Sequence, residues 1–257
     1  MMKNLFDVSG KVAVVTGGSR GIGAMIARGY VENGVRTYIS SRKAPVCDAM
    51  AEELSAHGEC ISLPNDLSTI EGVERFRAEF REREEELHIL VNNAGAAWGA
   101  PLEEFPESGW DKVMDINLKG PFYLSVKLLP ELRAAATEDD PARVINIASI
   151  DGLHVNPQEH YPYSASKAGM IHLTRALARR LAPEDITVNA VCPGPFESKM
   201  MEYNLRKFGD EIRARNPRKR IGTPEDMAGV SIYLASRAAA YVTGAAIPVD
   251  GGIFAVS

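Results

Sequence analysis

The fold of this chain follows from the segment Lys11-Val12-Ala13-Val14-Val15-Thr16-Gly17-Gly18-Ser19-Arg20-Gly21-Ile22-Gly23, in which a β-branched run leads directly into a glycine-rich turn. The run predicts a short buried strand of a parallel sheet, and residues 24–33 are compatible with a helix. A strand, a glycine turn and a helix in this order are the context that a dinucleotide site requires. Glycine lets the backbone approach the pyrophosphate, and the free amides of the helix N-terminus point toward it.

Strands and helices alternate along the rest of the chain. Further strands are expected at 36–40, 60–67, 87–91, 143–148, 186–191 and 246–249, and the one at 60–67 ends in a turn. Helices are expected at 45–57, 69–85, about 106–136 and 163–182, and from Thr223 onward, where threonine followed by proline is typical of a helix start. The alternation predicts one doubly wound α/β domain over residues 1–257, with a parallel sheet of about seven strands and helices on both faces.

The composition is that of an ordinary globular protein. Of the 257 residues, 45% are hydrophobic and 25% are charged. The net charge of -5 gives no bias toward nucleic acid or an anionic membrane, and no apolar run is long enough to span a bilayer. Three cysteines without Cys-x-x-Cys spacing fit a reducing cytoplasm, and five histidines show no metal-ligand spacing. We therefore expect a cytoplasmic protein without a metal site.

The segment Tyr163-Ser164-Ala165-Ser166-Lys167 carries a candidate catalytic pair. Residues four apart on a helix share a face, so an ammonium can lie beside the phenol. A tyrosine titrates near pH ~10 when unperturbed, and a nearby cation favours the phenolate. The spacing also occurs by chance, and then it places an aromatic ring in the core and a lysine in solvent. Two polar residues strengthen the catalytic interpretation, namely Ser149 at a strand end and Asn117 in an otherwise apolar helical pattern.

The residues after the second strand predict the choice of cofactor. An NAD-selective sheet carries an acidic residue there to hold the ribose hydroxyls, whereas this chain has Ser41-Arg42-Lys43. Arg20 adds a second guanidinium from the glycine turn. A 2′-phosphate would accept charge-assisted hydrogen bonds from both arginines, so the pattern favours NADP(H). The alternative is that Arg42 and Lys43 are solvated surface charges.

In combination these motifs resemble the short-chain dehydrogenase/reductase family, and the resemblance covers essentially the whole chain. It is carried by Thr16-Gly17-x-x-x-Gly21-Ile22-Gly23, Asp66, Asn92-Asn93-Ala94-Gly95, Asn117, Ser149, Tyr163-x-x-x-Lys167, Pro193-Gly194 and Arg220-x-Gly222-x-Pro224-Glu225-Asp226. The resemblance implies a Rossmann-type sheet, a homotetramer and an oxidoreductase that reduces a carbonyl to a secondary alcohol. The expected interfaces are the helices that carry Asn117 and Tyr163 and the region of the last strand.

The resemblance also implies the roles of four catalytic residues. Tyr163 protonates the developing alkoxide, and Ser149 hydrogen-bonds the carbonyl oxygen, so these two contact the substrate. Lys167 lowers the tyrosine pKa and holds the nicotinamide ribose, and Asn117 positions a water that relays protons to Lys167. Each has a structural alternative: Ser149 as a strand-end cap, for example, or Asn117 as a core residue satisfied by one hydrogen bond.

Cofactor binding is implied for residues from six segments. They are Gly17, Ser19, Arg20, Gly21, Ile22, Gly23, Ser41, Arg42, Asp66, Leu67, Asn93, Ala94, Gly95, Tyr163, Lys167, Pro193, Gly194, Phe196 and Ser198. Asp66 is expected at the adenine. Ser198 stands where the family usually has threonine, and it keeps the hydroxyl that contacts the nicotinamide carboxamide.

Within the family, the chain is similar to NADPH-dependent 3-oxoacyl-acyl-carrier-protein reductases, in particular to the branch associated with rhamnolipid synthesis. Residues 92–103, 108–114 and 140–147 carry this similarity. It implies 3-oxoacyl thioesters as substrates, bound to a carrier protein or to coenzyme A. The alternatives are a sugar, polyol or xenobiotic carbonyl reductase, and, from another class, a cofactor-binding sensor without catalysis.

A local feature of residues 195–220 bears on the substrate. Residues 206–220 hold seven cationic side chains against two acidic ones, a local net charge of +5. An apolar set comes just before them: Phe196, Met200, Met201, Tyr203 and Leu205. An apolar lining with a basic rim suits an acyl chain on a phosphopantetheine arm of an acidic carrier protein. The alternative is a solvated mobile lid.

Overall fold

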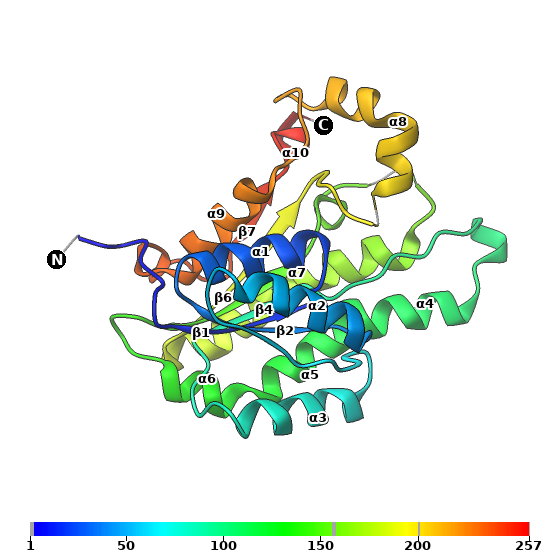
Figure 1. Cartoon of the computed structure of the whole chain (residues 1–257). Coiled ribbons are helices and arrows are strands. Elements are labelled where there is room, and N and C mark those ends of the chain that lie inside the picture. Colours follow the sequence, from blue (N-terminus) through cyan, green and yellow to red (C-terminus); the bar gives the residue numbers. More distant parts are fainter. Residues whose placement is uncertain (1–2, 156–157, 200, 257) are drawn as a thin grey trace.

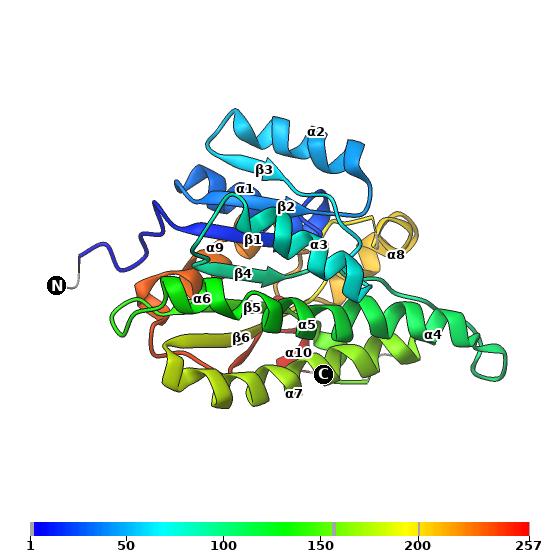
Figure 2. The same ribbon diagram turned by 90° about the horizontal axis from the view of Figure 1, so that it is seen from below.

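The computed structural model describes residues 3–155, 158–199 and 201–256, and it places a central sheet between two layers of helices (Figure 1). The strands of this part of the chain pair in parallel in the order β3-β2-β1-β4-β5-β6-β7, and Figure 2 shows β3 to β6 side by side in that order. They are β1 Val12–Thr16, β2 Arg36–Ser40, β3 Cys60–Ser62, β4 Ile89–Asn92, β5 Ala142–Ile147, β6 Ile186–Pro193 and β7 Ala246–Val249. The predicted doubly wound parallel sheet is confirmed.

The helices cover both faces of the sheet. They are α1 Gly21–Glu32, α2 Ala44–Ser55, α3 Ile70–Arg81, α4 Glu107–Met114, α5 Gly120–Lys127, α6 Leu129–Ala135, α7 Tyr161–Leu181, α8 Glu202–Arg215, α9 Pro224–Ala235 and α10 Ile253–Val256. Short 3₁₀ turns lie at Leu102–Glu104, Ile150–Gly152, Ala182–Glu184 and Arg237–Ala239. The helix start predicted at Thr223 is confirmed, and Thr223 forms a capping box there with Asp226.

Alternate residues of each strand point into different halves of the core. Val15 of β1 packs with α1, α2 and α9, whereas Val14 packs with α3, α5, α6 and α7. This is the period-two pattern of a strand buried on both faces. Burying both faces fixes the register, because a shift by one residue would exchange the two sets of side chains.

The chain changes direction across the sheet between β1 and β4. β1 pairs with β2 on one side and with β4 on the other, so the connections after β1 and β4 diverge. In open sheets of this kind, ligands bind in the crevice outside the carboxyl ends of the strands at that point. The glycine turn after β1 and the polar residues after β4 and β5 all lie at this edge.

The long helical region expected at about 106–136 is confirmed, but it is divided into three helices with a π-helical turn at Asp115–Lys119. The Gly120 amide bonds Asp115 O, five residues back. Pro121 follows and has no N–H, so it cannot bond the carbonyl four residues earlier, which belongs to Asn117. The proline therefore favours a wider turn, and such turns are frequent at functional sites.

Two other features differ from the prediction, namely the end of the third strand and an additional helix. The third strand ends at Ser62 instead of Leu67, because Pro64 has no N–H to continue the ladder. Helix α8 lies in the segment 195–220, for which the sequence pattern predicted no helix. Its apolar residues are few, so the helical periodicity is weak.

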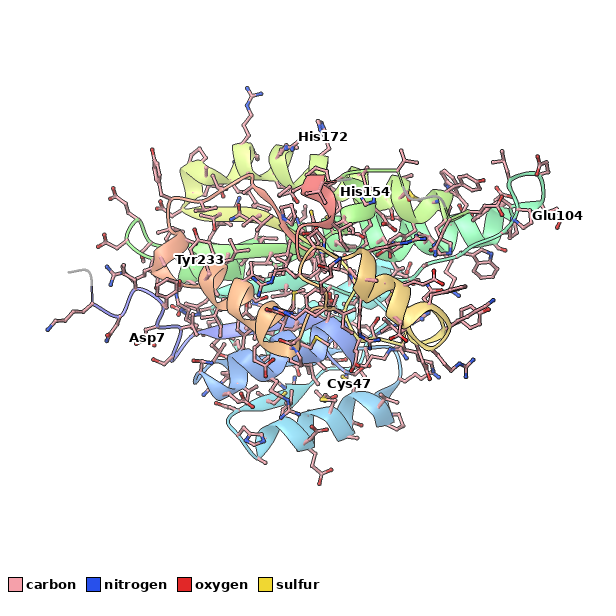
Figure 3. The ribbon with its side chains drawn as sticks, turned by 90° about the horizontal axis from the view of Figure 1, so that it is seen from above. Asp7, Cys47, Glu104, His154, His172 and Tyr233 are labelled. Carbon is pink, nitrogen blue, oxygen red and sulfur yellow. The ribbon has the colours of Figure 1, made fainter. Side chains whose placement is uncertain are left out.

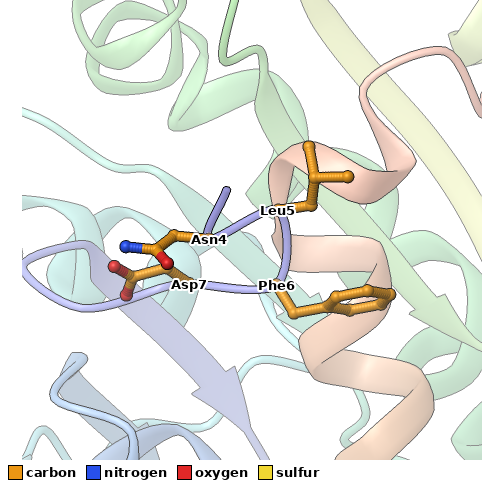
Figure 4. Close-up of a pocket in the computed structure, with 4 residues that line it drawn as sticks. All are labelled: Asn4, Leu5, Phe6 and Asp7. Atoms are coloured by element: carbon orange, nitrogen blue, oxygen red, sulfur yellow. The ribbon is translucent and has the colours of Figure 1, made fainter. Parts of the chain in front are cut away.

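One pocket lies at the opposite end of the sheet from the glycine turn. It is lined by Asn4, Leu5, Phe6 and Asp7 (Figure 4). None of the predicted site residues contributes to it. Among the described residues, no helix has the length and hydropathy that a bilayer crossing requires, and no three His, Cys, Asp or Glu side chains group as a metal site would need.

Candidate active site

The structure brings three of the predicted catalytic residues together at the end of β5. Ser149 follows β5, and Tyr163 and Lys167 lie on α7. The Ser149 hydroxyl lies beside the Tyr163 phenol and lowers its pKa. The Lys167 ammonium donates to Ile147 O at 2.7 Å and lies 5.6 Å from the centroid of the Tyr163 ring. A carbonyl oxygen that approaches this hydroxyl pair would therefore meet two donors at once.

Asn117 joins the same cluster from the π-helical turn. Its Oδ1 accepts from the Ala96 amide at 2.8 Å, and its Nδ2 donates to Ala96 O and to Ser166 Oγ, both at 3.0 Å. A Cβ at Gly95 would lie 3.1 Å from Asn117 Oδ1 and 3.8 Å from Lys167 Nζ. The position of Gly95 thus marks where Asn117 and Lys167 approach each other, and a side chain there would crowd both.

Ser166 belongs to this network, although the sequence reasoning did not select it. Its hydroxyl donates to Tyr163 O at 2.8 Å and accepts from Asn117. The side chain is fully buried. The available signal was its place three residues after Tyr163, which puts it on the catalytic side of α7.

Burial decides the protonation of the pair. It raises the pKa of Tyr163 to about 12, against the hydrogen bond from Ser149, which lowers it. Burial also lowers the pKa of Lys167 to about 8. That Lys167 lowers the Tyr163 pKa stays a prediction. The ammonium bonds a carbonyl instead of the phenol, and desolvation penalises the phenolate. The phenol keeps its proton at neutral pH.

The glycine turn leads directly into the N-terminus of α1. The Arg20 side chain caps none of the first amides of α1 within the described residues, and no acidic side chain lies in that turn. A Cβ at Gly23 would lie 2.3 Å from Gly17 O, so only glycine fits there. Ser198 lies over the turn, with its Cβ 3.2 Å from a Cβ placed on Gly21. Free amides at a helix N-terminus fit a pyrophosphate.

Asn93 and Ala94 lie beside the turn, but Asn93 acts as a brace. Thr16 Oγ1 accepts from the amides of both residues at 2.9 Å. Asn93 Nδ2 donates to Thr16 O at 2.8 Å. These bonds hold the ends of β1 and β4 together. Thr16 itself was missing from the predicted site, although its position directly before the first glycine was visible in the sequence.

The residues predicted to contact the adenosine end of the cofactor do not pair with one another. The hydroxyls of Ser40 and Ser41 are buried without a hydrogen-bond partner among the described residues. Arg20 and Arg42 are exposed, and neither forms an ion pair with another of the residues that the structure describes. The Gly17 amide donates to Ser40 O, so the two segments adjoin. An unsatisfied hydroxyl near unpaired guanidiniums fits a phosphate group.

Two residues expected near the adenine are already engaged. Asp66 Oδ1 accepts from the amide and the hydroxyl of Ser68, at 3.1 and 2.7 Å. The Leu67 side chain is buried in the core between α3 and α5. Leu67 therefore offers only its backbone to a ligand, and Asp66 has one carboxylate oxygen left for one.

The predicted apolar lining is corrected at Phe196. Its side chain is only 2% exposed, and a Cβ at Gly222 would lie 2.2 Å from the Phe196 ring. The ring fills the core instead of lining a pocket, because Phe196 is bridged to Gly222 and its ring packs with the core cluster around α9. Tyr203 by contrast is 57% exposed. Met200 lies outside the described residues. Pro193 ends β6 and Gly194 follows it, and their predicted contact with the cofactor stays a prediction.

Two of the seven cations of residues 206–220 are paired. Arg213 contacts Asp210 at 3.3 Å, and Arg220 forms a two-pronged bond with Asp226, one contact of which is 2.9 Å. The others have no ion-pair partner among the described residues: Arg206, Lys207, Arg215, Arg218 and Lys219. These five cations are referred to below as the α8 basic surface.

Comparison with known proteins places this site in a family. Residues 17–254 match the family model described as enoyl-(acyl carrier protein) reductase. A Pseudomonas aeruginosa protein named rhamnolipids biosynthesis 3-oxoacyl-[acyl-carrier-protein] reductase is 46% identical over 253 residues, covering 98% of this chain and 99% of that protein. An NAD-dependent glycerol dehydrogenase of Listeria innocua is 32% identical over 96% of this chain and 95% of its own.

The solved structures agree with the sequence comparison. The Pseudomonas aeruginosa RhlG/NADP active-site complex superposes with a TM-score of 0.95 at 45% identity, over 98% of this chain and 100% of that one. With the parallel sheet, the glycine turn and the Ser149–Tyr163–Lys167 cluster in place, the chain belongs to the short-chain dehydrogenase/reductase family.

Proposed function

We propose that this chain is an NADPH-dependent reductase that converts the ketone of a 3-oxoacyl thioester into a secondary alcohol. The neighbouring hydroxyls of Ser149 and Tyr163, beside the buried ammonium of Lys167, carry the proposal. The substrate class is supported by the relative at 46% identity, whose name gives 3-oxoacyl-[acyl-carrier-protein]. The cofactor is supported by the unpaired Arg20 and Arg42 and by the superposed NADP complex.

Each residue of the cluster has a different role in the reaction at the carbonyl oxygen. Bound NADPH supplies a hydride to the carbonyl carbon. Ser149 holds the carbonyl oxygen, and the protonated Tyr163 phenol gives that oxygen its proton as negative charge develops there. The ketone thus gains one hydride and one proton and becomes the alcohol. Lys167 keeps its positive charge next to the phenol below pH about 8 and favours the transient phenolate.

Asn117 and Ser166 complete the arrangement. Asn117 holds the loop at Ala96 and the start of α7 through Ser166. In the proposed mechanism it positions water near Lys167, from which the tyrosine regains its proton. The glycine turn and the serines at 40–41 would hold the cofactor, with Ser198 above the turn.

A sugar or polyol reductase is the second candidate, because a glycerol dehydrogenase is among the relatives. Purified protein is assayed with NADPH against acetoacetyl thioester and simple ketones, and with NADP against glycerol and sugar alcohols. We expect kcat/KM for the thioester to exceed the others by about tenfold or more. A higher value for a polyol would reject the 3-oxoacyl proposal. Catalysis with none of them, together with tight NADPH binding, would favour the sensor alternative.

The thioester partner we propose is an acidic acyl carrier protein, which would contact the α8 basic surface. None of its five cations forms an ion pair among the described residues, although Lys219 donates to Ala214 O and Lys207 contacts Tyr203. The exposed Tyr203 adds apolar contact beside them. Complementary charge steers association and fixes orientation more than it adds affinity. Carrier and substrate would then approach the site from the side of α8.

Charge reversal tests this contact. In Arg206→Glu/Arg215→Glu, KM for a carrier-bound 3-oxoacyl substrate should rise about tenfold, because like charges now face each other. KM for a 3-oxoacyl thioester of a small thiol should stay within about twofold. The matched control is Arg75→Glu/Arg81→Glu, the same charge change on exposed positions of α3. An equal rise in KM for the carrier-bound substrate in both double variants, or a rise in neither, would mean that the carrier binds elsewhere.

The remaining parts of the proposal concern organisation. We propose one catalytic domain over residues 1–257 with a lid at 195–220, working in the cytoplasm as a homotetramer. Exposed apolar side chains on α4 and α5 support an interface there: Trp110, Tyr123 and Val126. β7 supports a second one, because it is the edge strand of the sheet beside β6.

A further inference from the structure

Asn216 is buried although the residues on both sides of it are exposed. It follows the last residue of α8, and only 1% of its surface reaches solvent, whereas Arg215 and Pro217 are exposed. Its Oδ1 accepts from the Arg218 amide at 2.8 Å, and its carbonyl accepts from the Lys219 amide at 2.9 Å. These two bonds shape the turn after α8. They leave the side-chain donor for a more distant contact.

That donor reaches the C-terminal segment. Asn216 Nδ2 donates to Asp250 O at 2.9 Å. Gly251 packs directly on the same amide group, since a Cβ there would lie 2.4 Å from Asn216 Oδ1. Gly251 also has a φ of +71°, which favours glycine. The end of α8 therefore fits against residues 250–251 with little freedom to move.

Asp250 in turn contacts the turn at Gly194, one of the residues predicted to bind the cofactor. A Cβ at Gly194 would lie 2.7 Å from Asp250 Cβ, and the Gly194 amide donates to Val249 O at 3.0 Å. The segment that contains α8 leaves the sheet at Gly194 and returns at Asn216. Both of its ends thus rest on the same residue, Asp250.

Asp250 also fixes the C-terminal helix near the Ser149 loop. Its two carboxylate oxygens accept from the amides of Gly252 and Phe254, at 2.8 and 2.7 Å. The ring centroids of Phe254 and His154 are 6.5 Å apart, and His154 lies five residues after Ser149. Figure 3 shows His154 beside the C-terminal helix.

We propose that Asn216 is a positioning residue that holds α8 against the Gly194 turn through Asp250. This rests on the proposed function, in which α8 bounds the substrate and Gly194 the cofactor. Neither Asn216 nor Asp250 takes part in the chemistry. Their effect is on where α8 lies when substrate binds.

Asn216→Asp tests the proposal, because it keeps the size and the acceptor but removes the donor to Asp250 O. We expect KM for the 3-oxoacyl thioester to rise about tenfold and kcat to change less than about twofold, since β5 and α7 keep their places. Without substrate, trypsin should cut α8 about tenfold faster. The cleavage sites are Arg206, Lys207, Arg213 and Arg215. Asn216→Ala should act in the same direction and replaces the first variant if that one does not fold.

The matched control is Asn204→Asp, the same change within α8 at a residue without a side-chain hydrogen bond among the described residues. It should leave trypsin cleavage unchanged. Unchanged KM and cleavage in both Asn216 variants would overturn the proposal. The proposal would also be overturned by faster cleavage throughout the chain together with equal losses in kcat and kcat/KM, because that result indicates general destabilisation. Cleavage needs no substrate, so it tests the contact even if the 3-oxoacyl substrate is wrong.

Discussion

Tyr163→Phe should lose most of its turnover, with kcat reduced about 10²–10⁴-fold, while NADPH affinity stays within about twofold. General acids contribute that range, and the substitution removes only one oxygen. The phenol has a pKa of about 12, so it is protonated throughout the neutral range and can donate to the alkoxide. Single-turnover reduction of a 3-oxoacyl thioester measures the chemical step, and cofactor fluorescence titration measures binding.

Tyr161→Phe is the matched control for that experiment. Tyr161 lies two residues earlier on the same helix, is 37% exposed and bonds Glu159 at 3.3 Å. Its loss should change kcat less than about twofold. If Tyr163→Phe also kept near-wild-type turnover, Tyr163 would not be the proton donor, and the mechanism proposed for the cluster would fail.

The second large effect concerns the cofactor. We expect the wild-type protein to prefer NADPH over NADH by about tenfold or more in kcat/KM. A hydrogen bond to a charged group contributes about 1.5–3 kcal/mol, and Arg20, Ser41 and Arg42 offer several donors to one phosphate. Ser41→Asp/Arg42→Ala should reverse the preference, because a carboxylate repels the 2′-phosphate and accepts from the ribose hydroxyls.

Steady-state kinetics with both cofactors measures this preference. Arg81→Ala removes an exposed arginine at the end of α3 and serves as the control, with no expected change in the ratio. Equal use of NADH and NADPH by the wild-type protein would show that Arg20 and Arg42 remain in solvent. A double variant that loses NADPH activity without gaining NADH activity would mean that these residues support the turn and do not select the cofactor.

The sequence by itself determined the sheet and the edge at which the site lies. The β-branched runs predict buried strands because each is long enough to cross the core and is followed by a turn. Strand ends then bring Gly17, Asn93 and Ser149 to one edge, since parallel strands share a direction. Helical spacing likewise placed Tyr163 and Lys167 on one face of a helix. These are short-range properties of the chain, so they can be predicted without knowing which residues pack against each other in the fold.

Only the tertiary structure decided which side chains meet and what burial does to them. Asn117 lies beside Ala96 and Ser166 at the wider helical turn that Pro121 favours. The periodicity of residues 106–136 does not reveal this turn. Phe196 points into the core instead of a pocket, and Asn216 bonds Asp250 across 34 positions of the chain. The Tyr163 pKa rises because desolvation outweighs the hydrogen bond from Ser149. Desolvation and long-range contacts depend on what packs around a residue, and local patterns of sequence do not contain that information.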